Sequence, residues 1–497
     1  MRTPPLSAIW LALCALLPAC SLPRPPAQVD PGAPGQWSAP LPASAALLPH
    51  GGSLALMADW WRQLDDPVLV SLIEAAETAS PTAASARTRI EEARASRVAA
   101  GAALAPTLNA SLSASRSNAP STGTPGTSST QASTDLPVVT TLQAGLQSSW
   151  EIDLFGGLRA TREAGDARLA GADARWHDAR ISVAAETANA YFGDRACRRQ
   201  LAVSVSDADS RAETARLTGL SMRAGFTSAA DAALARASAA EAAARLNQQR
   251  AQCAVQVQAL VALTGLDVAS LQAKLDAAPV DAAPAAVRAI HRVPADALAQ
   301  RPDVYAAELA VAAASADAGA ALAQRFPKLT LQGSIDTAQL RTGNARSTLD
   351  TWTIGPLALT VPIFDGGTRA ANEAAAQARY EEAVALYRGS VRQAVREVEE
   401  ALINLRSTDE RAADADLAVQ NYQASFNATQ ARYGSGLASL FELEEARRTL
   451  FASQTARVAL QRERAQAWVS LYRSMGGGWS RPDAAATTRT SSVAPSP

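Results

Sequence analysis

The stretch TLNASLSAS, Thr107 to Ser115, decides how this 497-residue chain has to fold. Leu and Ala alternate along it with Thr, Asn and Ser, a period of two that is typical of a strand with one apolar and one polar face. The alternation predicts a first strand at about 107–117 and recurs at about 140–153 and 328–339. A fourth segment at about 351–361 changes phase near Pro356, which indicates a bulge or an edge position. The sequence therefore predicts four strands.

Each predicted strand has the length that crosses a lipid bilayer at a tilt. Four strands cannot close a barrel, and a membrane tolerates no open sheet edge, so several chains have to share one barrel. Two chains would give eight strands with a filled interior, and three would give twelve strands around a pore. On this hypothesis Leu108, Ala110 and Leu112 face lipid, and Trp150 and Trp352 lie at opposite ends of their strands in aromatic belts. The alternative is a soluble four-stranded sheet with one wet face.

The chain is an internal duplication. LFGGLRA, from Leu154, matches FDGGTRA, from Phe364, and RAGFTSAADAALARA, from Arg223, matches GSGLASLFELEEARR, from Gly434. Both pairs are about 210 residues apart, the signature of a repeated unit. Each copy reads as a short helix, two strands and a helical hairpin. The hairpins are expected at about 159–263 and 369–475, because almost no helix breaker interrupts these segments.

Composition excludes several classes of function. Only 5% of the residues are aromatic although 48% are hydrophobic, which favours closely packed, alanine-rich helices. The formal net charge of -1 argues against a nucleic-acid binder. His50, His177 and His291 stand alone without metal-ligand spacing, and no phosphate-binding loop or nucleophile motif is present. We therefore expect no catalysis, no metal and no cofactor other than a covalent lipid.

The N-terminus predicts export and lipidation. Residues 1–19 have the apolar core of a signal peptide, and Leu17-Pro-Ala-Cys20 resembles the lipobox of bacterial lipoproteins, in which the Cys is acylated. Ser21 resembles the pattern that is sorted to the outer membrane. The alternative is an ordinary signal peptide that happens to contain a Cys. Residues 20–58 are interpreted as a lipidated linker, and the Ser/Thr/Pro-rich residues 480–497 as a disordered tail.

Two further cysteines fit the first helical hairpin. Cys197 lies 28 residues before Gly225 and Cys253 lies 28 residues after it. In an antiparallel hairpin that turns at Gly225 both reach the same height, which predicts a disulfide in the oxidising periplasm. The alternative is a pair of small buried thiols.

Four motifs in order resemble the TolC-like outer-membrane efflux proteins, in particular the NodT-type lipoproteins. They are WWRQLDDPVLVSLIEAA from Trp60, the segment RPDVYAAELAVAAASADAGAALAQRFPKLTLQGS from Arg301, VPIFDGGTRA from Val361, and LYRSMGGGW from Leu471. The resemblance implies repeats at 59–278 and 279–479 and a mainly α fold with membrane β-strands. It implies a homotrimer with a shared twelve-stranded barrel in the outer membrane and a helical barrel in the periplasm. Partners would be a periplasmic adaptor protein and, through it, an inner-membrane pump.

The resemblance also assigns a gate and a docking surface. The gate would lie just after the second turn and comprise Phe441, Glu442 and Glu445. Phe441 would form an apolar ring and Glu445 an acidic ring that favours cations, with Glu442 one residue round the helix. The alternative is a solvated face on which Glu442, Glu444 and Glu445 pair with Arg447 and Arg448. Adaptor-docking residues are expected in the two turns that form the tips: Arg223, Gly225, Phe226 and Ser228 in the first, and Gly434, Gly436, Leu437 and Ser439 in the second.

The function expected from all of this is passive, gated conduction of drugs or other small molecules out of the cell. Conduits for metal cations or for secreted proteins remain alternatives within the channel class. A lipid-anchored periplasmic coiled-coil scaffold is the alternative from another class, although a scaffold has no use for bilayer-length strands.

Overall fold

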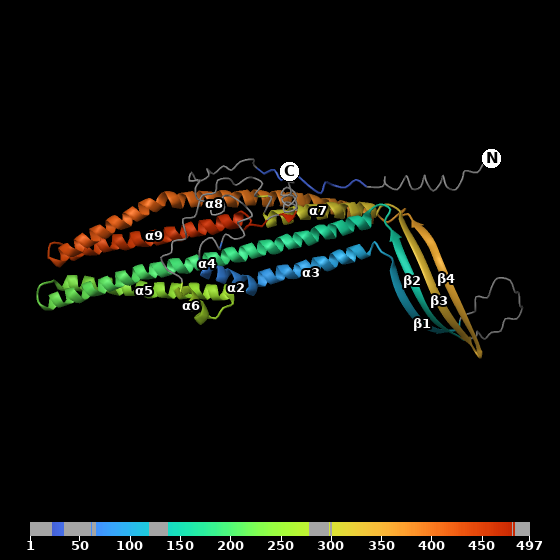
Figure 1. Cartoon of the computed structure of the whole chain (residues 1–497), viewed down its shortest axis with the longest axis horizontal. Coiled ribbons are helices and arrows are strands. Elements are labelled where there is room, and N and C mark those ends of the chain that lie inside the picture. Colours follow the sequence, from blue (N-terminus) through green and yellow to red (C-terminus); the bar gives the residue numbers. More distant parts are fainter. Residues whose placement is uncertain are drawn as a thin grey trace, which may run out of the picture. The chain divides into compact units, whose positions relative to one another are not determined.

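The computed structural model describes residues 22–33, 61, 66–118, 138–277, 298, 301–479 and 481–482 (Figure 1). The predicted signal peptide, Cys20, the loop at 119–137 and most of the C-terminal tail lie outside the described residues. The described chain divides into two compact units. The first comprises residues 91–170 and 308–385 with the N-terminal residues up to 29, and the second comprises 30–90, 171–307 and 386–497.

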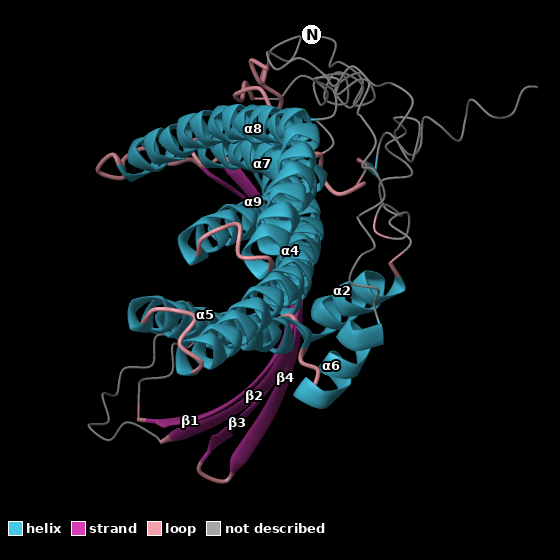
Figure 2. Ribbon diagram, turned by 90° about the vertical axis from the view of Figure 1, so that its left-hand side faces the viewer, coloured by secondary structure: helices cyan, strands magenta, loops and turns pink. Residues whose placement is uncertain are grey.

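The first unit contains one antiparallel sheet. Its strands are β1 (Thr107–Ser117), β2 (Val139–Ile152), β3 (Lys328–Thr342) and β4 (Ala345–Thr360), in the order β1-β2-β3-β4. Figure 2 shows the four strands as a single curved sheet. The order places strands from both sequence copies side by side, because β2 of the first copy pairs with β3 of the second. β1 and β4 are left as the two edges.

One face of the sheet is largely apolar, as the alternation predicts. Residues that pair directly across an antiparallel sheet share a face. Ala110, Leu146, Ile335 and Trp352 form one such row, and Leu108 and Leu112 lie on the same face of β1. These side chains are not covered within the chain: Leu112 is 86% exposed and Trp352 is 73% exposed. The opposite face carries most of the Ser, Thr, Asn and Gln residues.

The second hairpin of the sheet is longer than its side-chain pattern predicts. β4 begins at Ala345 rather than at about 351, and β3 continues to Thr342 rather than to about 339. Thr342 pairs with Ala345, so the turn has two residues and Gly343 adopts the positive φ that such turns require. Backbone hydrogen bonds extend the ladder beyond the apolar alternation, since pairing needs no side-chain pattern.

The longer β4 corrects the expected place of Trp352. Trp352 pairs with Ile335 in the middle of β4, not at an end of the strand. Trp150 does lie near an end of β2, where its Nε1 donates to the Leu104 carbonyl oxygen at 2.9 Å. The phase change near Pro356 is confirmed as a register shift opposite Leu331 and Gly333, and it falls on an edge strand.

Asp side chains begin the long helices where they leave the sheet. α4 runs Gly157–Arg223 and α8 runs Thr368–Gly434. Asp153 accepts hydrogen bonds from the backbone amides of Leu158 and Arg159, and Asp365 accepts them from Gly367 and Arg369. These bonds satisfy amides that have no partner inside the helix. Within FDGG the Asp directly precedes the glycines, whereas Asp153 lies three residues before Gly156. The two copies therefore cap the helix start in the same way with Asp residues at different positions relative to the glycines.

The second unit is built on two helical hairpins. α4 turns into α5 (Ala229–Thr264), and α8 turns into α9 (Leu440–Ser474). Each hairpin has its own apolar seam. Ala208, Ala242 and Leu246 bury one another in the first, and Phe426, Leu443 and Leu450 do so in the second. Small residues in the first seam allow the close helix approach that the composition predicts.

Four shorter helices complete the described chain: α2 (Pro67–Ala79), α3 (Pro81–Ala102), α6 (Val268–Ala277) and α7 (Pro302–Ala323). By length and composition alone, α7 could cross a membrane, as could α5 and α6 if that bent pair were one span. Val304 and Val311 of α7 are almost fully buried within the protein, so its hydropathy is explained as that of a core helix.

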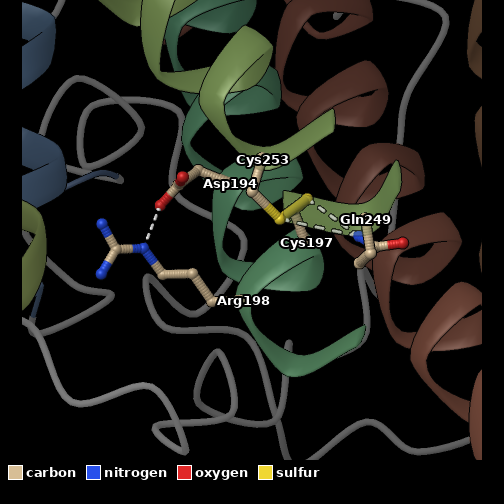
Figure 3. The surroundings of a disulfide bond; sticks show 5 residues. All are labelled: Asp194, Cys197, Arg198, Gln249 and Cys253. Carbon is tan, nitrogen blue, oxygen red and sulfur yellow. Dashed lines mark hydrogen bonds and ion pairs between the residues drawn. A yellow bond between two sulfur atoms is a disulfide. The ribbon is translucent and has the colours of Figure 1, made fainter. Parts of the chain in front are cut away.

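A disulfide ties α4 to α5. Cys197 and Cys253 are bonded, with their Cα atoms 5.5 Å apart, which is the pairing that the equal spacing about Gly225 predicts. The Gln249 side chain donates to the Cys197 sulfur at 3.1 Å, and on the neighbouring turn of α4 Arg198 pairs with Asp194 at 2.8 Å (Figure 3). The bond links residues separated by 56 positions and so restricts the unfolded hairpin.

We expect the double substitution Cys197→Ser/Cys253→Ser to destabilise the α4–α5 hairpin by about 2–4 kcal/mol, because the unfolded chain regains the freedom of a long loop. The measurement is the denaturant midpoint of helix loss by circular dichroism, on protein purified in detergent. Reductant should lower the wild-type midpoint and leave the double variant unchanged. A wild-type midpoint that does not respond to reductant would contradict the structural role of the bond.

Candidate functional site

The two helical turns share one construction. In the first, Gly225 has φ +80 and the Phe226 amide donates to the Ser221 carbonyl oxygen at 2.9 Å. In the second, Gly436 has φ +77 and the Leu437 amide donates to the Arg432 carbonyl oxygen at 2.7 Å. Such a left-handed residue followed by a bond back to the last helical turn ends a helix sharply. A glycine is needed at that position because a Cβ makes this conformation costly.

Serines begin the helices that return from both turns. The Ser228 Oγ accepts from the Asp231 amide at 3.0 Å, and the Ser439 Oγ accepts from the Glu442 amide at 3.2 Å. Between the glycine that ends one helix and the serine that begins the next, each turn exposes an apolar side chain to solvent: Phe226 is 86% exposed and Leu437 is 70% exposed. The residues expected at the docking tips therefore do lie in two matched, exposed turns.

Glu442 has a local structural role. Its carboxylate accepts from the Ser439 backbone amide at 2.7 Å, which completes a capping box at the start of α9. Hydrogen bonds from the Ser439 amide and hydroxyl lower the pKa of Glu442 below a glutamate's ordinary value. Glu442 is thus engaged in holding the start of α9, a role that the resemblance does not assign to this gate residue.

Phe441 and Glu445 lie together on the first turns of α9. Phe441 is 72% exposed, and the Glu445 carboxylate accepts from Arg448 at 2.7 Å. Within the single chain, therefore, the pairing of Glu445 with Arg448 that the solvated-face interpretation requires is present. An exposed phenyl ring beside it has no such local explanation. Leu234, which stands in the place of Glu445 in the first copy, is also exposed.

Behind these exposed residues lies a buried set of charges, here called the charge cluster: Asp207 and Arg211 of α4, and Glu444 and Arg447 of α9. Arg211 donates to Asp207 at 2.9 Å and also contacts Glu444. Arg447 donates to Glu444 at 2.5 Å. The cluster joins the first helical hairpin to the second, and Arg245 of α5 adds a third guanidinium that pairs with Asp207 at 3.3 Å.

Neutral hydroxyls satisfy the cluster further. The Ser238 hydroxyl of α5 donates to Glu444 at 2.6 Å, and Arg447 donates to the Thr214 hydroxyl at 3.0 Å. Burial lowers the pKa of Arg447, and the nearby Glu444 carboxylate opposes this effect. Removing one member would strand the others without water, which typically costs about 3–5 kcal/mol.

The charge cluster is the part of the site that the sequence does not reveal. The solvated-face interpretation places Arg447 in water, yet Arg447 is only 3% exposed, so that part of the alternative is wrong. Its counterpart in the first copy, Arg236, is exposed. The sequence evidence for the cluster is limited to the segment Glu444-Glu445-Ala-Arg447-Arg448. Helical spacing pairs each Glu with an Arg three positions later, but it does not show which of the two pairs is buried.

Comparisons with known proteins place this geometry in a family. Residues 72–266 and 293–477, more than half of the chain, match the family described as outer membrane efflux protein. The pyoverdine export outer membrane protein OpmQ of Pseudomonas aeruginosa is 31% identical over 481 residues, which cover 94% of this chain and 96% of OpmQ. The toluene efflux pump outer membrane protein TtgI of Pseudomonas putida is 29% identical over 489 residues, which cover 96% of this chain and 98% of TtgI.

A solved structure, described as that of a membrane protein from Pseudomonas aeruginosa, has the same fold. It superimposes with a TM-score of 0.74 at 27% identity, covering 92% of this chain and 99% of that chain. The mainly α fold with a small membrane sheet and the family that the motifs indicate are both confirmed. The chain belongs to the outer membrane efflux protein family and is an outer-membrane component of an efflux system.

Proposed function

We propose that three copies of this chain form one channel, in which each contributes four strands to a closed twelve-stranded barrel. The observation that carries the proposal is the sheet itself. β1 and β4 are unpaired edges of 11 and 16 residues, and unpaired backbone groups are not tolerated in hydrocarbon. Pairing β4 of one chain with β1 of the next removes every edge, and twelve strands leave an open lumen where eight would not.

The apolar face has the height of a membrane. It extends along β2 from Ile152, in the row of Leu329 and Leu359, to Leu142, ten positions away. In the two outermost rows it is apolar on β1 and β2 only, because β3 and β4 carry Thr337, Gln339, Thr348 and Asp350 there. Ten residue steps of ~3.3 Å, tilted by ~40°, give a height of about 25 Å. This apolar band would contact lipid, and the Ser/Thr/Asn/Gln face would line a water-filled pore.

The N-terminal residues support lipidation at Cys20. Ser315 donates to the Pro25 carbonyl oxygen at 2.5 Å, Tyr380 donates to the Pro26 carbonyl oxygen at 3.0 Å, and Arg24 pairs with Glu163. These contacts fix the chain shortly after Cys20 against helices of the unit that contains the sheet. An acyl chain on Cys20 would then be held near the membrane, where it adds to the anchoring by the barrel.

The proposed conduction is passive, with no chemical step in this chain. The named cargoes of the two relatives, pyoverdine and toluene, differ greatly in size and polarity, which supports a wide, unselective pore. We therefore propose small organic molecules, drugs among them, as the substrates. An inner-membrane pump would supply the energy, through a periplasmic adaptor that docks on the two exposed turns.

The gate would lie at the start of α9. In a trimer, three copies of Phe441 and Glu445 would converge on the axis as an apolar and an acidic ring. Glu444, the residue before Glu445, is bound to Arg211 of α4, so the charge cluster would hold the gate segment against the first hairpin. Opening would require this buried contact to rearrange.

The native mass of the protein in detergent, with the detergent contribution subtracted, tests the barrel. We expect three chains per particle, because only assembly removes the edges of the sheet. A monomer that stays in solution without detergent would refute the channel and favour the scaffold interpretation.

The substitution Arg211→Gln tests the link to the gate. It removes one of the positive charges beside the buried carboxylates of Asp207 and Glu444. We therefore expect the closed channel to lose about 3–5 kcal/mol of stability relative to the open channel, which should raise the single-channel conductance in planar bilayers. The double variant R211Q/E444Q, which removes a buried charge of each sign, should recover much of the closed state. Arg216→Gln is the matched control, because Arg216 makes an exposed pair with Glu213 on the same helix. Equal conductance in R211Q and R216Q would exclude the link.

The substitution Gly436→Trp tests docking. No atom lies within 4 Å of a Cβ added at Gly436, so the indole would project from the tip and obstruct a partner. We expect efflux, measured as resistance of a strain that depends on this channel, to be lost while trimer assembly remains. Gly436→Asn is the control for the backbone, because Asn tolerates the left-handed conformation. If the Trp variant exports as well as the Asn variant, the second turn does not dock a partner.

A further inference from the structure

Three arginines form a row across the sheet at the end remote from the helices. Arg116 of β1 pairs with Thr140 of β2, Thr140 pairs with Arg341 of β3, and Arg341 pairs with Arg346 of β4. Because paired residues share a face, these arginines lie on the same face as Leu112 and Trp352. This arginine row is therefore on the lipid-facing side and not in the lumen.

The arginine row lies directly beyond the apolar band. One row closer to the helices come Ala114 and Leu142, with Gln339 and Thr348 on the other two strands. The next two rows carry Leu112, Ile335 and Trp352. The helices leave the opposite end of the strands, so the arginine row marks the outward edge of the band. The inner edge has no such row: there the Leu329 row is apolar on β2, β3 and β4.

The arginines have neutral or like-charged neighbours. Arg341 donates twice to the neutral Gln339 of its own strand, at 3.2 and 3.0 Å. Arg341 and Arg346 are direct cross-strand partners, and like charges in that position repel. No ion pair found among the described residues includes Arg116, Arg341 or Arg346.

Acidic residues near the row are few. Asp350 is the one acidic residue that strand pairing places on the same face, in the row of Leu112. It lies four positions along β4 from Arg346, about 13 Å at ~3.3 Å per residue, which is beyond the reach of a direct ion pair. In the loop sequence from Asn118 to Val138, Asp135 is the only charged residue. The row therefore keeps an excess of positive charge at the edge of the band.

We propose that the arginine row binds the phosphate groups of phosphorylated lipids in the outer leaflet of the membrane. The inference rests on the proposed barrel, in which three chains would supply a ring of such rows. A phosphate between Arg341 and Arg346 relieves their repulsion and matches the paired donors of a guanidinium. The same lipid places its acyl chains on the apolar band, which a free phosphate ion cannot do. The continuity of the two surfaces is why we assign a lipid.

Lipid binding to the purified full-length protein in detergent tests the inference. Diphosphorylated lipid A is titrated in, and bound lipid is counted by native mass spectrometry, which reports the number of chains at the same time. Each guanidinium near a charged lipid surface contributes about 5-fold in affinity, so R116Q/R341Q/R346Q should bind on the order of 100-fold more weakly. The charge-matched control is R87Q/R89Q/R379Q, which removes three exposed arginines from helices and should bind like the wild type.

Two further arms do not depend on the folding of the triple Gln variant. Wild-type protein should lose a similar factor in affinity when lipid A without phosphates replaces the diphosphorylated form. The variant R116K/R341K/R346K keeps the charges but not the paired donors and should bind with intermediate affinity. Equal affinity for both lipids, or for wild type and the Gln variant, would overturn the inference.

Inorganic phosphate separates a lipid site from a free-anion site. If millimolar phosphate displaces lipid A completely, the row is an anion site and the lipid assignment is wrong. The outcomes also separate this inference from the channel. If the wild-type protein is a monomer that needs no detergent, the barrel is refuted. If it is a trimer and the triple Gln variant binds lipid A as tightly as the wild type, only the lipid site is refuted.

Discussion

Unpaired backbone groups at the two edges of the sheet are the constraint on which the rest of the structure depends. If a strand is not paired on both sides, some of its backbone amides and carbonyls lack hydrogen-bond partners, and hydrocarbon cannot supply such partners. The pairing of β2 with β3 removes the inner edges by joining the two sequence copies. In the proposed barrel, β1 and β4 would be completed by other copies of the chain. Assembly would then be a requirement of the backbone, and the apolar band would set the depth of the barrel in the membrane.

The helical part follows a different logic. Apolar seams bring α4 to α5 and α8 to α9, and each hairpin is held by its cap, its glycine turn and, in the first, its disulfide. The contact between hairpins through the charge cluster is polar. A polar contact of this kind is strong only in one geometry, because displaced charges have no water to replace their partners. That property would suit the proposed gate, which has to hold one arrangement and then release it.

Sequence reasoning located the elements well where their patterns are long. The limits of β1 and the positions of both turns were predictable, because strict alternation and paired glycines leave few alternatives. It failed at β4, where the residues from Ala345 to Asp350 lack the apolar alternation and only the backbone ladder makes them a strand. Trp352 was misplaced for the same reason. Among the site residues, Phe441 and the tips are exposed, and Glu442 is the N3 residue of the capping box that begins at Ser439.

The sequence alone determined the duplication, the four strands, the two hairpins and the pairing of Cys197 with Cys253, since each is encoded by local periodicity or by equal spacing along the chain. Only the tertiary structure decided which charges are buried and which residues form rows. Glu444 and Arg447 look like any surface pair until α4 brings Arg211 against them. Arg116 joins Arg341 and Arg346 in one row only through strand register. Both facts depend on contacts between residues about two hundred positions apart or more, and no local pattern carries that information.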